Sequence, residues 1–215
     1  MSKIVQKNLT WEYIYMLGMT AIGCMLAFLL NKIIFPVILI LFIVNLAGVV
    51  VLWTRPLSRN LLYLLNVLNC LASVSFACLL VTVFIKSVDS FLTMMIIIVV
   101  MDVFSFTKKG KKTPNARLIN QSNTLARLSI CLPVPGKPGL QPIIGVGDLY
   151  FYSVISVFLL HFFGANNFGY MLLMVLAGQL LNILFIAIIK NKTWYKGFPA
   201  TLFPGILSLI IMIII

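Results

Sequence analysis

The sequence predicts an all-α polytopic membrane protein with about seven transmembrane helices packed as a bundle. Two observations carry this prediction. Hydrophobic residues make up 62% of the 215 residues and charged residues only 9%, whereas soluble domains carry about 45–50% apolar and about 25% charged residues. The apolar residues also fall into runs of about 20, the length that a helix needs to cross a bilayer. A soluble globular protein and a disordered chain are therefore excluded.

Seven successive runs are apolar enough to be spans. They are 11–31, 33–53, 60–86, 90–106, 143–163, 168–189 and 198–215. The third run is long and is expected to tilt, while the fourth is short and contains Asp102. Three regions follow: four N-terminal spans in 1–106, a loop in 107–142, and three further spans in 143–215.

The basic residues predict the orientation of these spans. The chain has 16 Lys and Arg against 4 Asp and Glu, a formal charge of +12. Such a balance in a soluble protein suggests nucleic acid, but here the cations lie between apolar runs, so we expect a lipid partner and no nucleic acid. If the N-terminus is in the cytoplasm, only Lys32 and Lys86 lie on the outer side, and the other Lys and Arg residues lie on the cytoplasmic side. Cytoplasmic loops of membrane proteins carry such an excess of Lys and Arg. The long loop is then cytoplasmic and the C-terminus lies on the outer face.

The loop 107–142 has two parts. It begins with a basic run, which favours a stop-transfer signal that contacts anionic lipid; the run is Lys108-Lys109-Gly110-Lys111-Lys112. The later part, Ala126 to Ile144, has two apolar stretches around a Pro-rich turn, Pro133 to Pro138. This pattern indicates a β-hairpin at the membrane surface, although the prolines weigh against regular strands.

Cysteine and histidine contribute little to the expected chemistry. The chain has four scattered Cys without a CxxC pair and a single His. A disulfide scaffold is therefore excluded and a zinc site has no support. We expect no metal and no other cofactor.

Two of the four acids lie where an acid is costly. Glu12 and Asp89 fall at span ends, where they reach water, but Asp102 and Asp148 lie inside apolar runs. An ionisable residue inside a membrane indicates a functional site. No Lys or Arg lies well inside a span to form a buried ion pair. A protonated Asp that only hydrogen-bonds a neighbouring helix would explain one such residue, and explains a pair less well.

The two acids are expected at one depth. Asp102 precedes Lys108 by six residues and Asp148 follows Ile143 by five, or about 9 Å and about 7.5 Å of helix. The first helix runs toward the cytoplasm and the next runs away from it, so the carboxyls meet if these helices pack together. Two such carboxyls share a proton. One then acts as general base on a water and the other as general acid toward a carbonyl, as in aspartic proteases.

Two neighbouring segments favour a site here. Gly145 and Gly147 precede Asp148, and small residues let helices approach closely; a plain helix-packing motif is the alternative. The segment Phe198 to Gly205 contains two prolines, which free backbone groups for an extended substrate. Proline is also common at an ordinary helix N-terminus.

Three motifs now stand in order: Met101-Asp102-Val103-Phe104, Gly145-Val146-Gly147-Asp148 with Leu149-Tyr150-Phe151-Tyr152-Ser153, and Pro199-Ala200-Thr201. This series resembles the presenilin and signal peptide peptidase family of intramembrane aspartyl proteases, whose members carry YD or FD, GxGD and PAL motifs on three spans. The run after GxGD is more similar to presenilins, as is the cytoplasmic loop. The resemblance implies a presenilin-like helical bundle. The shortness of the chain favours a microbial homologue.

The resemblance also implies roles for individual residues. Asp102 and Asp148 are the catalytic pair that it implies. The substrate-binding residues that it implies are Gly145, Gly147, Pro199, Ala200 and Thr201. The reaction is hydrolysis of peptide bonds within transmembrane helices of other proteins, without a metal. The substrate unwinds to a strand, and the loop segment 126–132 or 140–144 is expected to pair with it.

The sequence departs from the family in three respects. It has seven predicted spans where family members typically have nine, Met101 replaces the aromatic residue before the first Asp, and Thr201 replaces the Leu of PAL. Both Asp remain, so these departures affect specificity more than chemistry. The motifs specify no partner subunit.

Other functions stay open at this point. A prepilin-peptidase-type protease also uses GxGD and a second Asp. A proton-coupled transporter or channel uses paired Asp to relay protons, and usually shows repeated halves with broken helices. An inactive membrane scaffold is the third alternative. The side chains of Gln179 and Asn182 on the sixth run are expected to form hydrogen bonds between helices.

Overall fold

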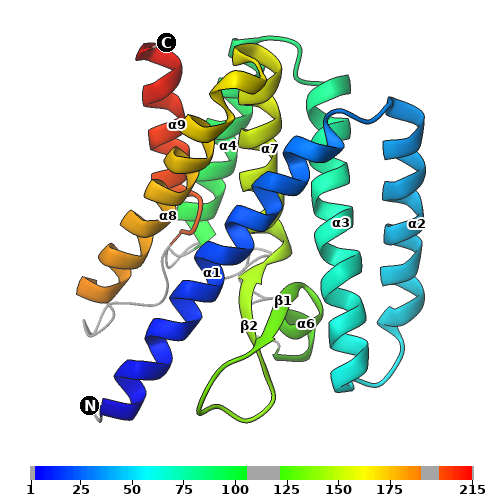
Figure 1. Cartoon of the computed structure of the whole chain (residues 1–215), viewed down its shortest axis with the longest axis vertical. Coiled ribbons are helices and arrows are strands. Elements are labelled where there is room, and N and C mark those ends of the chain that lie inside the picture. Colours follow the sequence, from blue (N-terminus) through cyan, green and yellow to red (C-terminus); the bar gives the residue numbers. More distant parts are fainter. Residues whose placement is uncertain (1–2, 106–121, 190–198, 215) are drawn as a thin grey trace.

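The chain folds as a bundle of helices with a small β-hairpin at one end (Figure 1). The structure is a computed structural model that describes residues 3–105, 122–189 and 199–214. Six described helices are long and apolar enough to cross a membrane: Trp11–Leu30, Phe35–Trp53, Arg59–Val83, Val88–Ser105, Val146–Phe163 and Ala165–Ile189. The prediction of an all-α, multi-pass membrane protein is therefore confirmed.

The elements follow one another in a simple order. The first four helices are α1 (Lys3–Leu30), α2 (Phe35–Trp53), α3 (Arg59–Val83) and α4 (Val88–Ser105). The short helix α6 (Ser122–Arg127), strand β1 (Ser129–Pro133) and strand β2 (Leu140–Gly145) come next. The last three helices are α7 (Val146–Phe163), α8 (Phe168–Ile189) and α9 (Leu202–Ile214).

The predicted count of seven spans is not confirmed, because α9 is short. It has 13 residues, or about 20 Å of helix, against a bilayer core of about 30 Å. The apolar run begins at 198, but Ala200 and Thr201 form a turn ahead of the helix. The backbone N–H of Gly205 donates to the carbonyl of Thr201 at 2.9 Å, which closes the first turn of α9.

Two other predicted bounds shift for local reasons. The third run is predicted to reach 86, but α3 ends at Val83 with Phe84 as its C-cap, and Ser87 and Ser90 cap the start of α4. Their side chains and backbone N–H groups form reciprocal hydrogen bonds, which is the geometry of a capping box. The fifth run was expected to start as helix at 143, but β2 continues to Gly145.

Helix α7 lies at the centre of the bundle. Every residue from Phe151 to Leu160 is buried, as expected of a helix that is apolar on all sides. It packs against α1, α3 and α8, and α1 crosses the bundle obliquely beside it (Figure 1). Helices α2 and α4 expose most of their apolar side chains, which suits a lipid environment.

The hairpin lies in the segment where the sequence predicts one. Strands β1 and β2 pair antiparallel, with Cys131 opposite Pro142. The turn between them contains Gly136 and Gly139 at φ of 81° and 70°. Glycine adopts such positive φ angles readily because it has no Cβ. The prolines that weighed against strands therefore lie at the end of β1 and in the turn, with Pro142 the exception within β2.

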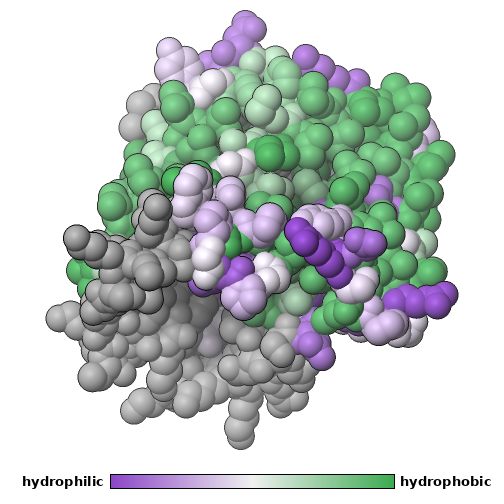
Figure 2. All heavy atoms as spheres, turned by 60° about the horizontal axis from the view of Figure 1, so that its bottom comes forward, coloured by the Kyte–Doolittle hydropathy of each residue, from purple (hydrophilic) through white to green (hydrophobic). Residues whose placement is uncertain are grey.

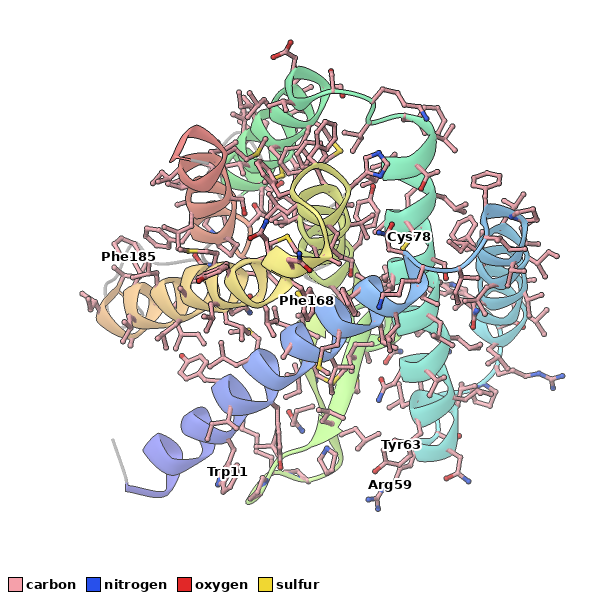
Figure 3. All side chains as sticks on the ribbon, turned by 45° about the horizontal axis from the view of Figure 1, so that its top comes forward. Trp11, Arg59, Tyr63, Cys78, Phe168 and Phe185 are labelled. Carbon is pink, nitrogen blue, oxygen red and sulfur yellow. The ribbon has the colours of Figure 1, made fainter. Side chains whose placement is uncertain are left out.

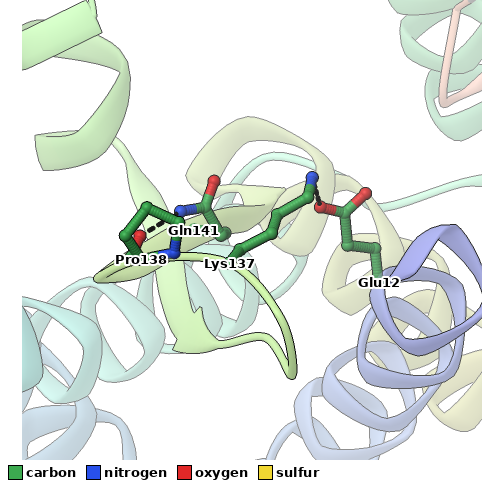
Figure 4. A network of polar contacts seen from close by, with 4 residues as sticks. All are labelled: Glu12, Lys137, Pro138 and Gln141. Atoms are coloured by element: carbon green, nitrogen blue, oxygen red, sulfur yellow. Dashed lines mark hydrogen bonds and ion pairs between the residues drawn. The ribbon is translucent and has the colours of Figure 1, made fainter. Parts of the chain in front are cut away.

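The hairpin tip contacts the start of the bundle. Lys137 at the tip forms an ion pair with Glu12 of α1, and the Gln141 side-chain amide donates to the carbonyl of Pro138 at 2.8 Å (Figure 4). The ion pair is partly exposed, so it adds little stability by itself. It ties the tip of the hairpin to α1.

Polar and aromatic side chains gather at the hairpin end. Figure 2, seen from that end, shows hydrophilic groups facing the viewer and hydrophobic surface along the sides. Figure 3 places Trp11, Arg59 and Tyr63 toward this end, where the Arg59 guanidinium donates to the Tyr63 hydroxyl at 3.3 Å. Aromatic residues of this kind are typical of a membrane–water interface.

Candidate active site

A cavity of about 490 Å³ lies between α4, α7 and the start of α9. Asp102 and Ser105 line it from α4, Gly147 and Asp148 from α7, and Thr201 from the turn before α9. The other lining side chains are apolar or aromatic. The two acids that stand out in the sequence therefore reach one space.

The packing of α4 on α7 explains why the acids meet. The rings of Phe91 and Phe158 stack with centroids 3.7 Å apart, and the two helices run antiparallel (Figure 1). Asp102 lies eleven residues after Phe91, and Asp148 lies ten residues before Phe158. These steps are about 16 Å and about 15 Å of helix, so both carboxyls come to the same level.

Thr201 holds the carboxyl of Asp102. The Thr201 hydroxyl donates to Asp102 Oδ2 at 2.7 Å, and the Thr201 backbone N–H donates to the same oxygen at 3.3 Å. Thr201 is buried. A leucine at this position would have no hydroxyl, so the first of these bonds depends on threonine being present.

Asp148 is placed by the start of α7. Gly145 is the N-cap of this helix, so Asp148 lies in the first turn and not five residues inside a span. The depth expected from the sequence is corrected in this respect, because β2 occupies the residues counted as helix. A carboxylate in a first turn is stabilised by the positive end of the helix dipole.

The two glycines before Asp148 have different surroundings. A Cβ at Gly145 would lie 3.1 Å from Asp148 Oδ2, so only glycine lets this carboxyl approach the backbone without a shift. A Cβ at Gly147 would meet nothing within 4 Å, and Gly147 lines the cavity. Glycine there keeps the space in front of Asp148 open.

The pair has no cationic partner within the described residues. The ion pair between Lys137 and Glu12 lies at the hairpin tip, and neither Asp102 nor Asp148 forms one with a described cation. The two carboxyls line the same cavity, whose other walls are mostly apolar. Two carboxyls that share an apolar cavity do not readily ionise together.

Pro199 and Ala200 do not line the cavity. Pro199 is buried, and the Ala200 carbonyl accepts hydrogen bonds from the Tyr152 hydroxyl at 3.0 Å and from the Asn182 side chain. These bonds hold the turn that presents Thr201 to Asp102. Pro199 and Ala200 therefore support the turn that carries Thr201 and do not face the cavity.

The site also depends on Tyr152 and Asn182, to which the sequence motifs assign no role. Tyr152 follows Asp148 by four residues, one helical turn, and this spacing is the sequence signal that could have found it. The structure shows that Tyr152 is buried, where its hydroxyl needs a partner. Asn182 was interpreted as a helix–helix hydrogen bond, but it bonds the turn that precedes α9. Gln179 Oε1 and Asn182 Oδ1 are buried with no hydrogen-bond partner in the described part of the chain.

Within residues 3–105, 122–189 and 199–214, no three His, Cys, Asp or Glu side chains come together to hold a metal ion. The chain matches no protein-family model, no curated protein and no solved structure. The basic run 108–112 and Phe198 lie outside the described residues.

Proposed function

We propose that this protein is an intramembrane aspartyl protease that hydrolyses peptide bonds within transmembrane segments of other proteins. The observation that carries the proposal is the common cavity of Asp102 and Asp148, two carboxyls from separate helices. Paired carboxyls at one level in an apolar bundle are costly, and acid–base catalysis gives the pair a use that packing does not. The order and spacing of the three motifs support the same function.

The chemistry assigns one role to each carboxyl. Two hydrogen bonds from Thr201 hold Asp102 Oδ2 as an acceptor, so we assign Asp102 as the general base. It takes a proton from water, whose oxygen attacks the carbonyl carbon of the scissile bond. Asp148 carries the proton that the pair shares and gives it to the carbonyl oxygen. In the breakdown of the tetrahedral intermediate the C–N bond breaks: Asp102 gives its proton to the leaving nitrogen, and Asp148 takes the proton of one hydroxyl, which forms the carboxylic acid and restores the pair.

The substrate has to unwind before it reacts. A helix is about 10–12 Å across and uses its own peptide groups internally, so its carbonyls are not available to the pair. The described sheet has two strands, so no third strand covers the outer edge of β2. β2 ends three residues before Asp148. Pairing of an unwound substrate with β2, one of the two segments that the sequence indicates, would bring its backbone beside that carboxyl.

The proposal includes an orientation. The N-terminus and the hairpin lie at one end of the bundle and the C-terminus lies at the other (Figure 1). The basic residues favour the cytoplasm for the hairpin end. Cleavage would then occur near the cytoplasmic side of the substrate span, and the outer face would carry the C-terminus.

A cleavage assay in liposomes tests the function. The purified protein is mixed with a tagged single-span substrate, and products are identified by mass spectrometry. Asp102→Asn and Asp148→Asn should each lower the rate by on the order of 10³-fold, because general acid–base catalysis contributes about 10²–10⁴-fold. Asp89→Asn is the matched control, since Asp89 is an exposed acid on the same helix as Asp102 and lies outside the cavity.

Each result of this assay bears on the proposal. Cuts within the span by the wild type and the Asp89→Asn variant, with both other variants silent, support it. Equal cleavage by all four proteins contradicts the catalytic assignment. If the wild type is inert but moves protons across the liposome membrane in a way that needs Asp102, the transporter alternative replaces the protease.

A further inference from the structure

Helix α3 carries three polar side chains on one face. Asn66, Asn69 and Ser73 follow the i, i+3, i+7 spacing of a helical stripe. Asn69 and Ser73 are buried, and polar groups in a membrane helix are unfavourable unless they find partners. Each of these three side chains forms a hydrogen bond with the backbone of the segment 127–146. The stripe therefore stabilises that segment and not α3 itself.

Asn66 covers the outer edge of β1. Its side-chain N–H donates to the Cys131 carbonyl at 2.6 Å, and its Oδ1 accepts from the Cys131 backbone N–H at 2.7 Å. Pro142, opposite Cys131 in the ladder, has no N–H to offer. A side-chain amide carries the same donor and acceptor as a peptide group, so Asn66 occupies the place of a third strand.

Asn69 holds the short helix before β1. Its side chain donates to the Arg127 carbonyl at 2.8 Å. The Arg127 guanidinium donates in turn to the carbonyls of Leu52 and Arg55, at 3.2 Å and 2.5 Å, at the end of α2. Arg127, the last residue of α6, is thereby tied to two spans.

Ser73 acts at the start of α7. Its hydroxyl donates to the Val146 carbonyl at 3.4 Å, and the Val146 N–H donates to the Leu128 carbonyl at 2.9 Å. Val146 lies two residues before Asp148. Both backbone groups of this residue are therefore bonded, so the backbone that leads into the catalytic turn has little freedom.

We propose that Asn66, Asn69 and Ser73 form an anchor that positions Asp148 and closes the outer edge of β1 to an incoming strand. Asn66 has the leading role, because it blocks β1 to an incoming strand. The inference rests on the proposed protease function, and it predicts that the anchor determines where a substrate is cut. A merely structural role, in which the three side chains satisfy buried backbone groups, predicts a change in stability alone.

The first measurement tests the anchor without any cleavage. The Cys131 thiol is fully buried, and burial raises its pKa to about 11, so only about one thiol in a thousand is ionised at pH 8. The wild type should therefore react slowly with a maleimide at Cys131 at this pH. Asn66→Leu, which loses both hydrogen bonds at similar volume, should react at least tenfold faster. Asn45→Leu is the matched control, because buried Asn45 bonds only a carbonyl of its own helix in the described structure.

The second measurement reads the cleavage positions by mass spectrometry. Asn66→Leu should spread the products over two or more positions and lower kcat/KM about tenfold, while Asn45→Leu keeps the wild-type product. Asn66→Asp, which keeps only the acceptor, should fall between them and serves if Asn66→Leu does not fold. Ser73→Ala should lower kcat with unchanged KM, whereas Ser75→Ala, whose buried hydroxyl has no partner among the described residues, should not.

The outcomes separate the two proposals. An inert wild type refutes the protease function, and Cys131 labelling still decides whether the anchor holds the hairpin. Faster labelling of Asn66→Leu with an unchanged cleavage position shows a structural anchor and overturns the positioning role. Unchanged labelling together with unchanged products overturns the anchor itself.

Discussion

The hydroxyl of Thr201 gives the sharpest test of the site. Thr201→Val removes the group that donates to Asp102 Oδ2 at 2.7 Å and keeps the shape of the side chain. The backbone N–H at 3.3 Å remains, so Asp102 keeps one donor. The variant therefore isolates a single hydrogen bond to the carboxyl that we assign as general base.

The expected loss follows from the strength of that bond. A hydrogen bond to a charged group contributes about 1.5–3 kcal/mol, and each 1.36 kcal/mol of activation free energy is about tenfold in rate. We expect kcat/KM to fall about 10- to 150-fold. Because Thr201 is almost fully buried, at 5% exposure, water cannot easily replace the lost donor.

The assay compares four proteins in the same liposomes. Thr201→Ser keeps the hydroxyl and should stay within about threefold of the wild type, since the donor that sets the expected loss is still present. Thr201→Leu also lacks the hydroxyl and should be as slow as Thr201→Val. Melting temperatures in detergent check that all four are folded. Thr201→Val with at least half of the wild-type kcat/KM would contradict a catalytic role for this hydrogen bond, as would equal losses in the Ser and Val variants.

Two further substitutions test the space and the packing around the site. Gly147→Leu should lower kcat/KM at least about tenfold with an unchanged melting temperature, because the new side chain projects into the cavity. A substrate displaced by 1 Å can already react about 10²-fold more slowly. Unimpaired cleavage by this variant would contradict the assigned location of the site. Gly178→Ala should lower the free energy of unfolding by about 1–3 kcal/mol, because its Cβ would lie 2.5 Å from Cα of Pro204 in α9. Gly169→Ala on the same helix, with nothing within 4 Å, is the control for thermal unfolding, and equal melting temperatures of the two variants would rule out the close approach of α8 and α9.

The spans were predictable because burial in lipid leaves a simple pattern. Runs of about 20 apolar residues need no tertiary information to be recognised, and six of them are helices long enough to cross a membrane. The seventh run did not give a span-length helix, since Pro199 and the turn at Thr201 delay the start of α9. The apolar composition of a run does not by itself indicate the residue at which its helix begins.

The acids were predictable for a related reason. Asp102 and Asp148 stand out because charge is rare inside apolar runs, and the antiparallel order of the two helices brings them to one level. Their detailed surroundings were less accessible. The β2 strand replaces the first residues of the expected span, so Asp148 lies in the first turn of α7. Strand and buried helix segments cannot be separated by periodicity when both are short and apolar.

Composition along single helices was enough to predict the membrane class of this protein, the approximate spans and the two acids inside them. The packing of the helices was needed to show that Thr201 bonds Asp102, that Tyr152 and Asn182 hold the turn at Ala200, and that Asn66 covers β1. These contacts join residues between 18 and 99 positions apart. Hydrogen bonds at such separations depend on how the helices pack, and no local pattern of residues encodes that.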